Sequence, residues 1–99
     1  MTVADASPSD DDLDWDNLGF VRASTYRMHV VRTLTDGPAI PSAIATDDVR
    51  IAKVSRALAE LRERNLVELL VDEDTRKGRY YGLTPQGEPI ADHIAEEDR

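Results

Sequence analysis

The stretch from residue 49 to residue 83 constrains the fold of this chain most. Apolar residues recur in its first part at the three- and four-residue spacing of one helix face: Ile51, Val54, Leu58 and Leu61. This spacing predicts a helix over residues 49–64, which ends at Asn65 because asparagine tolerates the left-handed conformation. Two runs with the composition of strands follow, residues 66–71 and 79–83, and a charged loop separates them. A helix that leads into a hairpin predicts a small α+β domain.

Two further helices are predicted before this stretch and one after it. The first covers about residues 20–35 and ends before Gly37 and Pro38, which suit a helix cap and prevent continuation. The second is short and begins at Pro41, and the last begins near Glu88 and is interrupted by Pro89. Together these elements predict an α+β fold with a three-helix core, a small antiparallel β-hairpin and a C-terminal helix.

The first 17 residues differ in composition from the rest of the chain. They contain six aspartates and no helical repeat of apolar residues. This composition predicts a disordered acidic arm over residues 1–17 and a single domain over residues 18–99. Leu13 and Trp15 stand out in the arm, and two interpretations stay open for them: a short strap on the domain, or contact with a partner chain.

The net charge of the chain is negative and unevenly distributed. The formal net charge is −8, which taken alone disfavours nucleic acid as a partner. The arm contributes −6, so residues 18–99 carry only −2, and local charge decides what a surface attracts at short range. The chain holds 20 acidic residues, 10 arginines and 2 lysines, a balance that resembles proteins of halophilic archaea. At molar salt the Debye length is only ~3 Å, so binding to a charged partner there depends on direct contacts.

Composition and spacing also disfavour several classes of function. The chain has no cysteine, and its two histidines, His29 and His93, lie far apart and outside any metal-ligand spacing. It has no glycine-rich phosphate loop and no nucleophile elbow. We therefore expect a protein that is not an enzyme and has no cofactor, metal or evident small-molecule ligand. Without a signal sequence or an apolar run of ~18 residues, the expected location is the cytoplasm, with no membrane contact.

The predicted helix over residues 49–64 carries cations on its outer side. Lys53, Ser55 and Arg56 flank the apolar Val54 and should therefore face outward, and Arg50 lies one turn earlier. Side chains of these types contact guanine or phosphate when the front of a helix enters a major groove. The alternative is that the four residues are ordinary solvated side chains on an exposed helix.

The loop of the predicted hairpin holds a second group of cations. Arg76, Lys77 and Arg79 surround Gly78, and a flexible basic tip of this kind suits a minor groove or a phosphate backbone. The acidic run of residues 72–74 opposes this interpretation, because carboxylates that face DNA repel it. The alternative is a solvated hairpin with internal ion pairs.

Two motifs in these elements resemble those of a known family. The segment Val54-Ser55-Arg56-Ala57-Leu58, followed by Leu61 and Asn65-Leu66-Val67-Glu68, is similar to the signature of winged helix-turn-helix regulators of the MarR and ArsR type. The segment Tyr80-Tyr81-Gly82-Leu83-Thr84-Pro85-Gln86-Gly87 is similar to their strand-to-helix stretch with its Leu-Thr-x-x-Gly pattern. The resemblance covers about residues 20–94. It departs from the family pattern at Asn65, where glycine is usual, in the short glycine-free turn before residue 49, and at Pro89.

The resemblance implies a transcriptional regulator that binds double-stranded DNA in a sequence-specific manner. Its third helix would enter the major groove, and its basic hairpin wing would lie on the flanking backbone or in the minor groove. By this analogy, seven residues are candidates for DNA contact: Arg50, Lys53, Ser55, Arg56, Arg76, Lys77 and Arg79. A homodimer is expected, with half-sites about one turn of DNA apart. The alternative is a winged-helix module of the transcription machinery that binds another protein without touching DNA.

Overall fold

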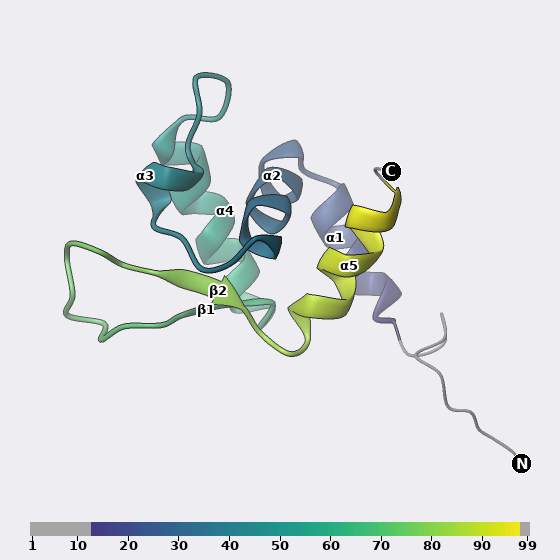
Figure 1. The fold of residues 1–99 in the computed structure, drawn as a ribbon. Helices are drawn as coiled ribbons and strands as arrows, with labels where there is room; N and C mark the ends of the chain where they lie inside the picture. The colour runs from purple at the N-terminus through teal and green to yellow at the C-terminus, as the bar shows by residue number, and fades with distance from the viewer. Residues whose placement is uncertain (1–12, 98–99) are drawn as a thin grey trace, which may run out of the picture.

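A computed structural model describes residues 13–97, in which five helices pack around a small two-stranded sheet (Figure 1). The sheet is antiparallel and pairs Leu69 with Tyr81, and an isolated bridge from Ala39 to Tyr81 extends it. This is the predicted α+β architecture, with the hairpin directly after the longest helix. The elements are α1 (Trp15–Arg22), α2 (Thr25–Thr35), α3 (Pro41–Ile44), α4 (Ile51–Glu63), β1 (Val67–Leu69), β2 (Tyr81–Leu83) and α5 (Gly87–Glu97).

The core forms around α2, which packs against α4, α1 and α5. Its aliphatic side chains are almost completely removed from water, and each contributes on the order of 1.5–3 kcal/mol of transfer free energy. On α4, the residues Val54, Leu58 and Leu61 are buried, as their spacing predicted. Ile51 was predicted in the same stripe but is 50% exposed, because it is the first residue of the helix and lies at the edge of the core.

The region predicted as one helix over residues 20–35 forms two. The hydroxyl of Ser24 accepts a hydrogen bond from the N–H of Arg27 at 3.3 Å, which starts α2 as a new helix. The carboxylate of Asp14 caps α1 in the same way. The helix α1 thus begins within the predicted acidic arm, most of which, residues 1–12, lies outside the described residues.

The Leu-Thr-x-x-Gly segment joins the hairpin to α5. The Thr84 hydroxyl is buried: it donates to the carbonyl oxygen of Asn65 at 2.6 Å and accepts from the N–H of Gly87 at 3.0 Å. Gly87 lies so close to Leu66 that a Cβ on it would be 2.1 Å from the Leu66 carbonyl oxygen. Asn65 has a φ of 62°, which confirms the left-handed end predicted for α4. These contacts attach the hairpin and α5 to the end of α4.

Pro89 lies in the first turn of α5 and does not interrupt the helix. The N–H of Glu88 already donates to the carbonyl oxygen of Thr84 at 3.0 Å, so the next bond of that series, from residue 89 to the carbonyl of Pro85, is the one that proline removes. The helix is continuous from Gly87, and its residues Ile90 and Ile94 are buried. The helix starts within one residue of Glu88, as the sequence predicted, and Pro89 costs one backbone hydrogen bond without ending the helix.

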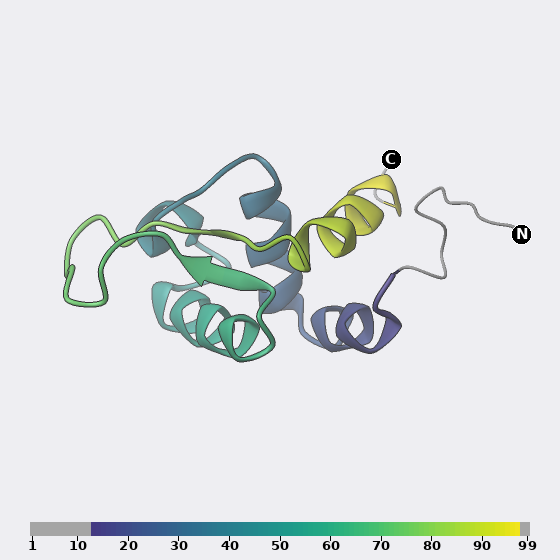
Figure 2. The ribbon, with the colours of Figure 1, turned by 90° about the horizontal axis from the view of Figure 1, so that it is seen from below.

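The hairpin loop and the terminal helices lie at opposite ends of the molecule. We name the hairpin loop, residues 70–80, the wing. Figures 1 and 2, which are related by a 90° turn, both show the wing projecting at one end, α1 and α5 at the other, and α4 between them. Within residues 13–97, the helices are too short or too polar to span a membrane.

Candidate nucleic-acid interface

A short helix and a turn set the direction of α4. Ile44, at the end of α3, is buried, and its carbonyl oxygen lies 2.7 Å from Nε2 of His29 on α2. In the following turn, the N–H of Thr46 donates to the carbonyl oxygen of Val49 at 2.8 Å. In return, the N–H of Val49 donates to the Thr46 hydroxyl at 3.0 Å. This reciprocal pair of hydrogen bonds closes the turn between α3 and α4 without a glycine.

The first half of α4 presents the predicted helix residues to solvent. Lys53, Ser55 and Arg56 are exposed on the helix, and Arg50 is exposed immediately before it. The ammonium of Lys53 lies 5.5 Å from the centre of the Tyr26 ring on α2, a cation–π distance. The prediction that Lys53, Ser55 and Arg56 face outward is confirmed.

One carboxylate lies within this cationic surface. Glu60 accepts a hydrogen bond from Nε of Arg27 at 3.1 Å, and its other oxygen lies 3.6 Å from Nε of Arg56. These three residues, with Lys53 and Tyr26, line an open cleft of about 220 Å³ between the start of α2 and α4. Three cations against one carboxylate leave the cleft with a net positive charge. The guanidinium of Arg56 is mostly exposed, so its pairing with Glu60 is weak and can be exchanged for another anion.

The cations of the wing fall into two groups. Arg76 and Lys77 are exposed beside Gly78, whose φ of 67° is a left-handed turn conformation. Within residues 13–97, neither Arg76 nor Lys77 forms an ion pair with a carboxylate. Arg79 is only partly exposed. The tip of the wing therefore has two available cations rather than three.

Arg79 directs its donors back into the wing. Its Nη1 donates to the carbonyl oxygens of Glu73 and Thr75, both at 2.9 Å. Its Nε donates to the Tyr81 hydroxyl at 3.4 Å, and this hydrogen bond raises the pKa of Arg79 above its ordinary value. A guanidinium that joins both sides of the loop organises the wing from within.

The acidic residues of the wing are partly used for internal contacts. The Glu73 carboxylate accepts a hydrogen bond from Nη2 of Arg62 on α4 at 2.8 Å and lies 3.9 Å from Nη2 of Arg79. Asp72 and Asp74 are exposed. Internal ion pairs, the alternative interpretation of this loop, thus form near its base, while the cations at its tip point to solvent.

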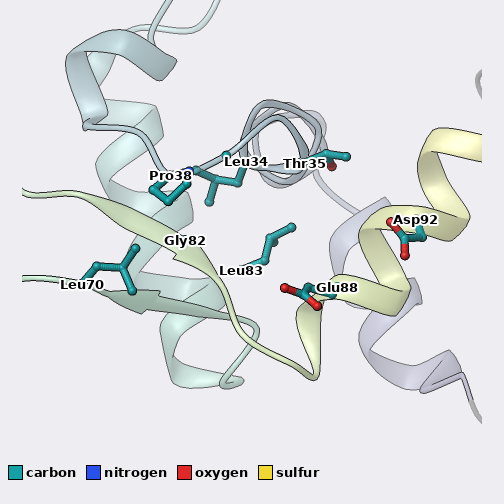
Figure 3. Close-up of a pocket in the computed structure, with 9 residues that line it drawn as sticks. Leu34, Thr35, Pro38, Leu70, Gly82, Leu83, Glu88 and Asp92 are labelled. Atoms are coloured by element: carbon teal, nitrogen blue, oxygen red, sulfur yellow. The ribbon is translucent and has the colours of Figure 1, made fainter.

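A second cavity, of about 300 Å³, lies between the end of α2, the sheet and α5 (Figure 3). Leu34, Leu70 and Leu83 form its walls, and Glu88 and Asp92 line it from α5. Because carboxylates repel phosphate, this cavity is not part of the cationic surface. Sequence reasoning predicted no cavity here, since its lining comes from four separate segments. Across the described part of the chain, no group of three or more His, Cys, Asp or Glu residues is placed to hold a metal ion.

Two exposed apolar side chains beside the predicted contacts were missed by sequence reasoning. Tyr26 and Ile51 are 37% and 50% exposed. Their apolar character favours burial, but both lie in the first turn of a helix, beyond the edge of the core. The available signal for Tyr26 was Ser24, a residue type that starts helices.

The order of the elements defines the class of fold. A helix (α2), a short helix (α3) and an exposed longer helix (α4) are followed by a hairpin with a long loop. This is a winged-helix domain, the fold that the sequence predicted.

Solved structures similar to this chain share the fold at low sequence identity. A mutant of ZitR from Lactococcus lactis matches with a TM-score of 0.67 and 20% identity, over 97% of this chain and 59% of that one. The adhesin competence repressor AdcR from Streptococcus pyogenes gives 0.67 and 18%, over 85% and 69%. NadR in complex with 4-hydroxyphenylacetate gives 0.64 and 21%, over 84% and 60%. The chain spans about two thirds of these structures or less. No family model and no curated protein matches it.

Proposed function

We propose that this protein is a transcriptional regulator that binds double-stranded DNA in a sequence-specific manner. In this proposal α4 enters the major groove, and the wing lies on the flanking backbone or in the minor groove. The observation that carries the proposal is the outward placement of Lys53, Ser55 and Arg56 on a helix whose opposite side is core. A major groove about 12 Å wide accepts one helix, and such side chains bond base edges and phosphates. The name of AdcR, a repressor with the same fold, supports this role.

The candidate residues take different roles in this proposal. Lys53, Ser55 and Arg56 contact bases or phosphates from α4, and Arg50, just before the helix, contacts the phosphate backbone. Arg76 and Lys77 contact the DNA from the tip of the wing. Arg79 acts through the wing, because its donors are engaged by the loop itself.

The acidic composition fits DNA binding in a salt-rich cytoplasm. We infer a halophilic archaeal source from the 20 acidic residues and only 2 lysines. At molar salt, the net charge of −8 acts only over ~3 Å, so it does not prevent an approach that ends in direct contacts. Binding that persists in molar KCl, measured by gel shift, is the expected result.

A homodimer completes the proposal. The terminal helices α1 and α5 lie at the end opposite the wing, and Trp15 on α1 is 50% exposed there. A dimer formed through this end directs two α4 helices to half-sites about one turn of DNA apart. Sedimentation of the full chain with and without a two-half-site duplex measures the stoichiometry, and a monomer on a single half-site would refute this part.

The decisive experiment combines genome-wide binding in the native host with gel shifts at high KCl. Replacing Lys53→Ala and Arg56→Ala together should weaken specific binding by on the order of 30-fold or more, because two groups at about 1–3 kcal/mol each are lost. The melting curve should remain nearly unchanged, since both side chains are exposed. The control is Arg32→Ala, which removes an exposed cation of α2 that lines neither the cleft nor the wing and should keep full binding. Unaltered occupancy in the first double mutant would sink the proposed surface.

The second candidate function is a protein-interaction module of the transcription machinery. The acid beside the cations favours it: Glu60 lies in the cleft, and Asp72 and Asp74 are exposed on the wing. Selection of the full chain against a randomised duplex library separates the two functions. If no sequence is enriched and a transcription protein still co-purifies after nuclease treatment, the interaction module replaces the DNA-binding function.

A further inference from the structure

The outer face of α4 begins with an apolar side chain. Ile51 is the first residue of the helix and is 50% exposed, and Ala52 beside it is exposed as well. Ser55 lies one turn after Ile51 and is also exposed, so the three side chains are neighbours on the helix surface. We name Ile51, Ala52 and Ser55 the front patch.

Two of the cations near the front patch already have partners, whereas Arg50, just before the helix, has none in the described part of the chain. Lys53 lies over the Tyr26 ring, and Arg56 lies 3.6 Å from a carboxylate oxygen of Glu60. The side chains of the front patch have no such partner within residues 13–97, and its largest member is aliphatic. A single exposed aliphatic side chain is common on protein surfaces, so its position decides what it means.

That position is the start of the helix proposed to enter the groove. Base contacts in helix-turn-helix complexes concentrate at the N-terminal end of the recognition helix. Thymine presents a C5 methyl group in the major groove, and apolar side chains contact it. The small side chains of Ala52 and Ser55 allow the helix backbone to approach the base edges closely.

We propose that Ile51 contacts the C5 methyl group of a thymine and thereby selects the base pair that faces the start of α4. This inference rests on the proposed DNA-binding function and adds the base that one position of the target must carry. Burial of the thymine methyl against Ile51 removes apolar surface of both from water, which strengthens binding without any hydrogen bond.

The test uses 2′-deoxyuridine, which pairs as thymine does but lacks the C5 methyl group. The full chain first selects its preferred duplex from a randomised library, and each thymine is then replaced singly. In the unmodified protein, one replacement per half-site should weaken binding by about fourfold, the value of one buried methyl group. Ile51→Ala should weaken binding to the thymine duplex by a comparable factor and should not respond to the same replacement.

Two control variants make the test specific. Ile51→Val keeps a branched apolar side chain and should retain part of the response to deoxyuridine. Leu70→Ala removes a similarly exposed leucine, 47% exposed at the base of the wing, and should retain the full response. Folding is checked by melting, which Ile51→Ala should hardly change, because alanine favours helix more than isoleucine does.

The possible outcomes separate the two proposals. If the library yields no preferred sequence, the DNA-binding function fails, and this inference fails with it. If a sequence is enriched but deoxyuridine has no effect at any position, only the thymine contact is overturned. The same holds if Ile51→Ala responds to deoxyuridine as strongly as the unmodified protein does.

Discussion

The two ends of the hairpin are held by different kinds of contact: buried hydrogen bonds at the base, and charged side chains at the surface further out. At its base, Thr84 is 3% exposed and hydrogen-bonds to Asn65 and Gly87, which fixes the sheet to α4 and α5. Beyond the sheet, the wing is held by the charged side chains of Arg79 and Glu73 at the surface, and its tip carries the exposed Arg76 and Lys77. The base therefore determines the fold, whereas the tip is free to adjust to a bound partner.

The buried hydrogen bonds and the exposed ion pairs differ in how much free energy each contributes to stability. A buried polar group that loses its partner costs about 1–3 kcal/mol, because water cannot replace the partner. An exposed ion pair contributes about 0–1 kcal/mol and is screened by salt. Substitutions at the base should therefore change the stability of the whole domain, and substitutions at the tip should change binding with little effect on stability.

The largest effect is expected for Gly87→Ala. The added Cβ would lie 2.1 Å from the carbonyl oxygen of Leu66, so the backbone of α5 or of the chain after α4 must move. We expect a loss of at least about 3 kcal/mol in the free energy of unfolding, a large part of the 5–15 kcal/mol typical of a domain. Urea denaturation followed by far-UV circular dichroism measures it.

Gly19→Ala is the matched control for this substitution. Gly19 lies inside α1, and a Cβ on it meets no atom within 4 Å. Alanine favours helix over glycine by about 0.5–1 kcal/mol, so this variant should be slightly more stable than the natural protein. Equal destabilisation by the two substitutions would show that the base of the hairpin is not a close approach.

A smaller effect is expected for Thr84→Val, which keeps the shape of the side chain and removes its hydroxyl. The carbonyl oxygen of Asn65 loses its hydrogen bond from the hydroxyl, whereas the N–H of Gly87 keeps its bond to the Thr84 carbonyl oxygen, so the free energy of unfolding should fall by about 1–3 kcal/mol. Thr84→Ser restores the hydroxyl and should recover most of this loss. A valine variant as stable as the serine variant would mean that packing alone holds this junction.

Much of this contrast was predictable from the sequence. The apolar spacing of Val54, Leu58 and Leu61 predicted the buried side of α4, and hence the outward direction of Lys53 and Arg56. Such patterns are local, so they survive folding unchanged.

Contacts between distant residues were not predictable in the same way. Arg79 was grouped with the tip cations because it is adjacent to Gly78, but its direction depends on Glu73 and Tyr81, which are neighbours only in the folded loop. The break between α1 and α2 was missed because the single capping bond of Ser24 prevails over a continuous helical pattern. The exposure of Ile51 was missed because it depends on where the core ends.

A smaller change in stability is expected for Arg79→Lys in the wing. Lysine keeps the charge but lacks the planar fork that bonds the carbonyl oxygens of Glu73 and Thr75 together with the Tyr81 hydroxyl. The free energy of unfolding should fall only slightly, because contacts at the surface are screened by water and salt. Limited proteolysis should cleave within the wing faster than in the natural protein.

DNA binding by the same variant tests how Arg79 acts. If Arg79 positions the wing, Arg79→Lys should weaken DNA binding, whereas Lys77→Arg, a control at the tip, should not. If Arg79 only supplies charge to DNA, Arg79→Lys should bind normally and resist protease. Gel shifts and cleavage mapping on the same samples distinguish the two roles.

The smallest effect is expected at the end opposite the wing, where Arg22 of α1 pairs with Glu97 of α5. The pKa of Glu97 lies below its ordinary value of 4.5, mainly because its carboxylate accepts a hydrogen bond from Arg22, with a smaller contribution from His93. A lowered pKa means that the pair stabilises the fold above pH 4.5 and that this contribution is lost as the pH falls below that value.

Arg22→Ala should therefore melt slightly below the natural protein near neutral pH, and the difference should shrink as the pH falls through the lowered pKa of Glu97, because a protonated Glu97 no longer attracts Arg22. Molar KCl should also reduce the difference at neutral pH, because the pair is exposed and screened, as the ion pairs of the wing are. A difference that persists unchanged in acid would show that Arg22 stabilises α1 through packing of its side chain, and that charge does not join the terminal helices.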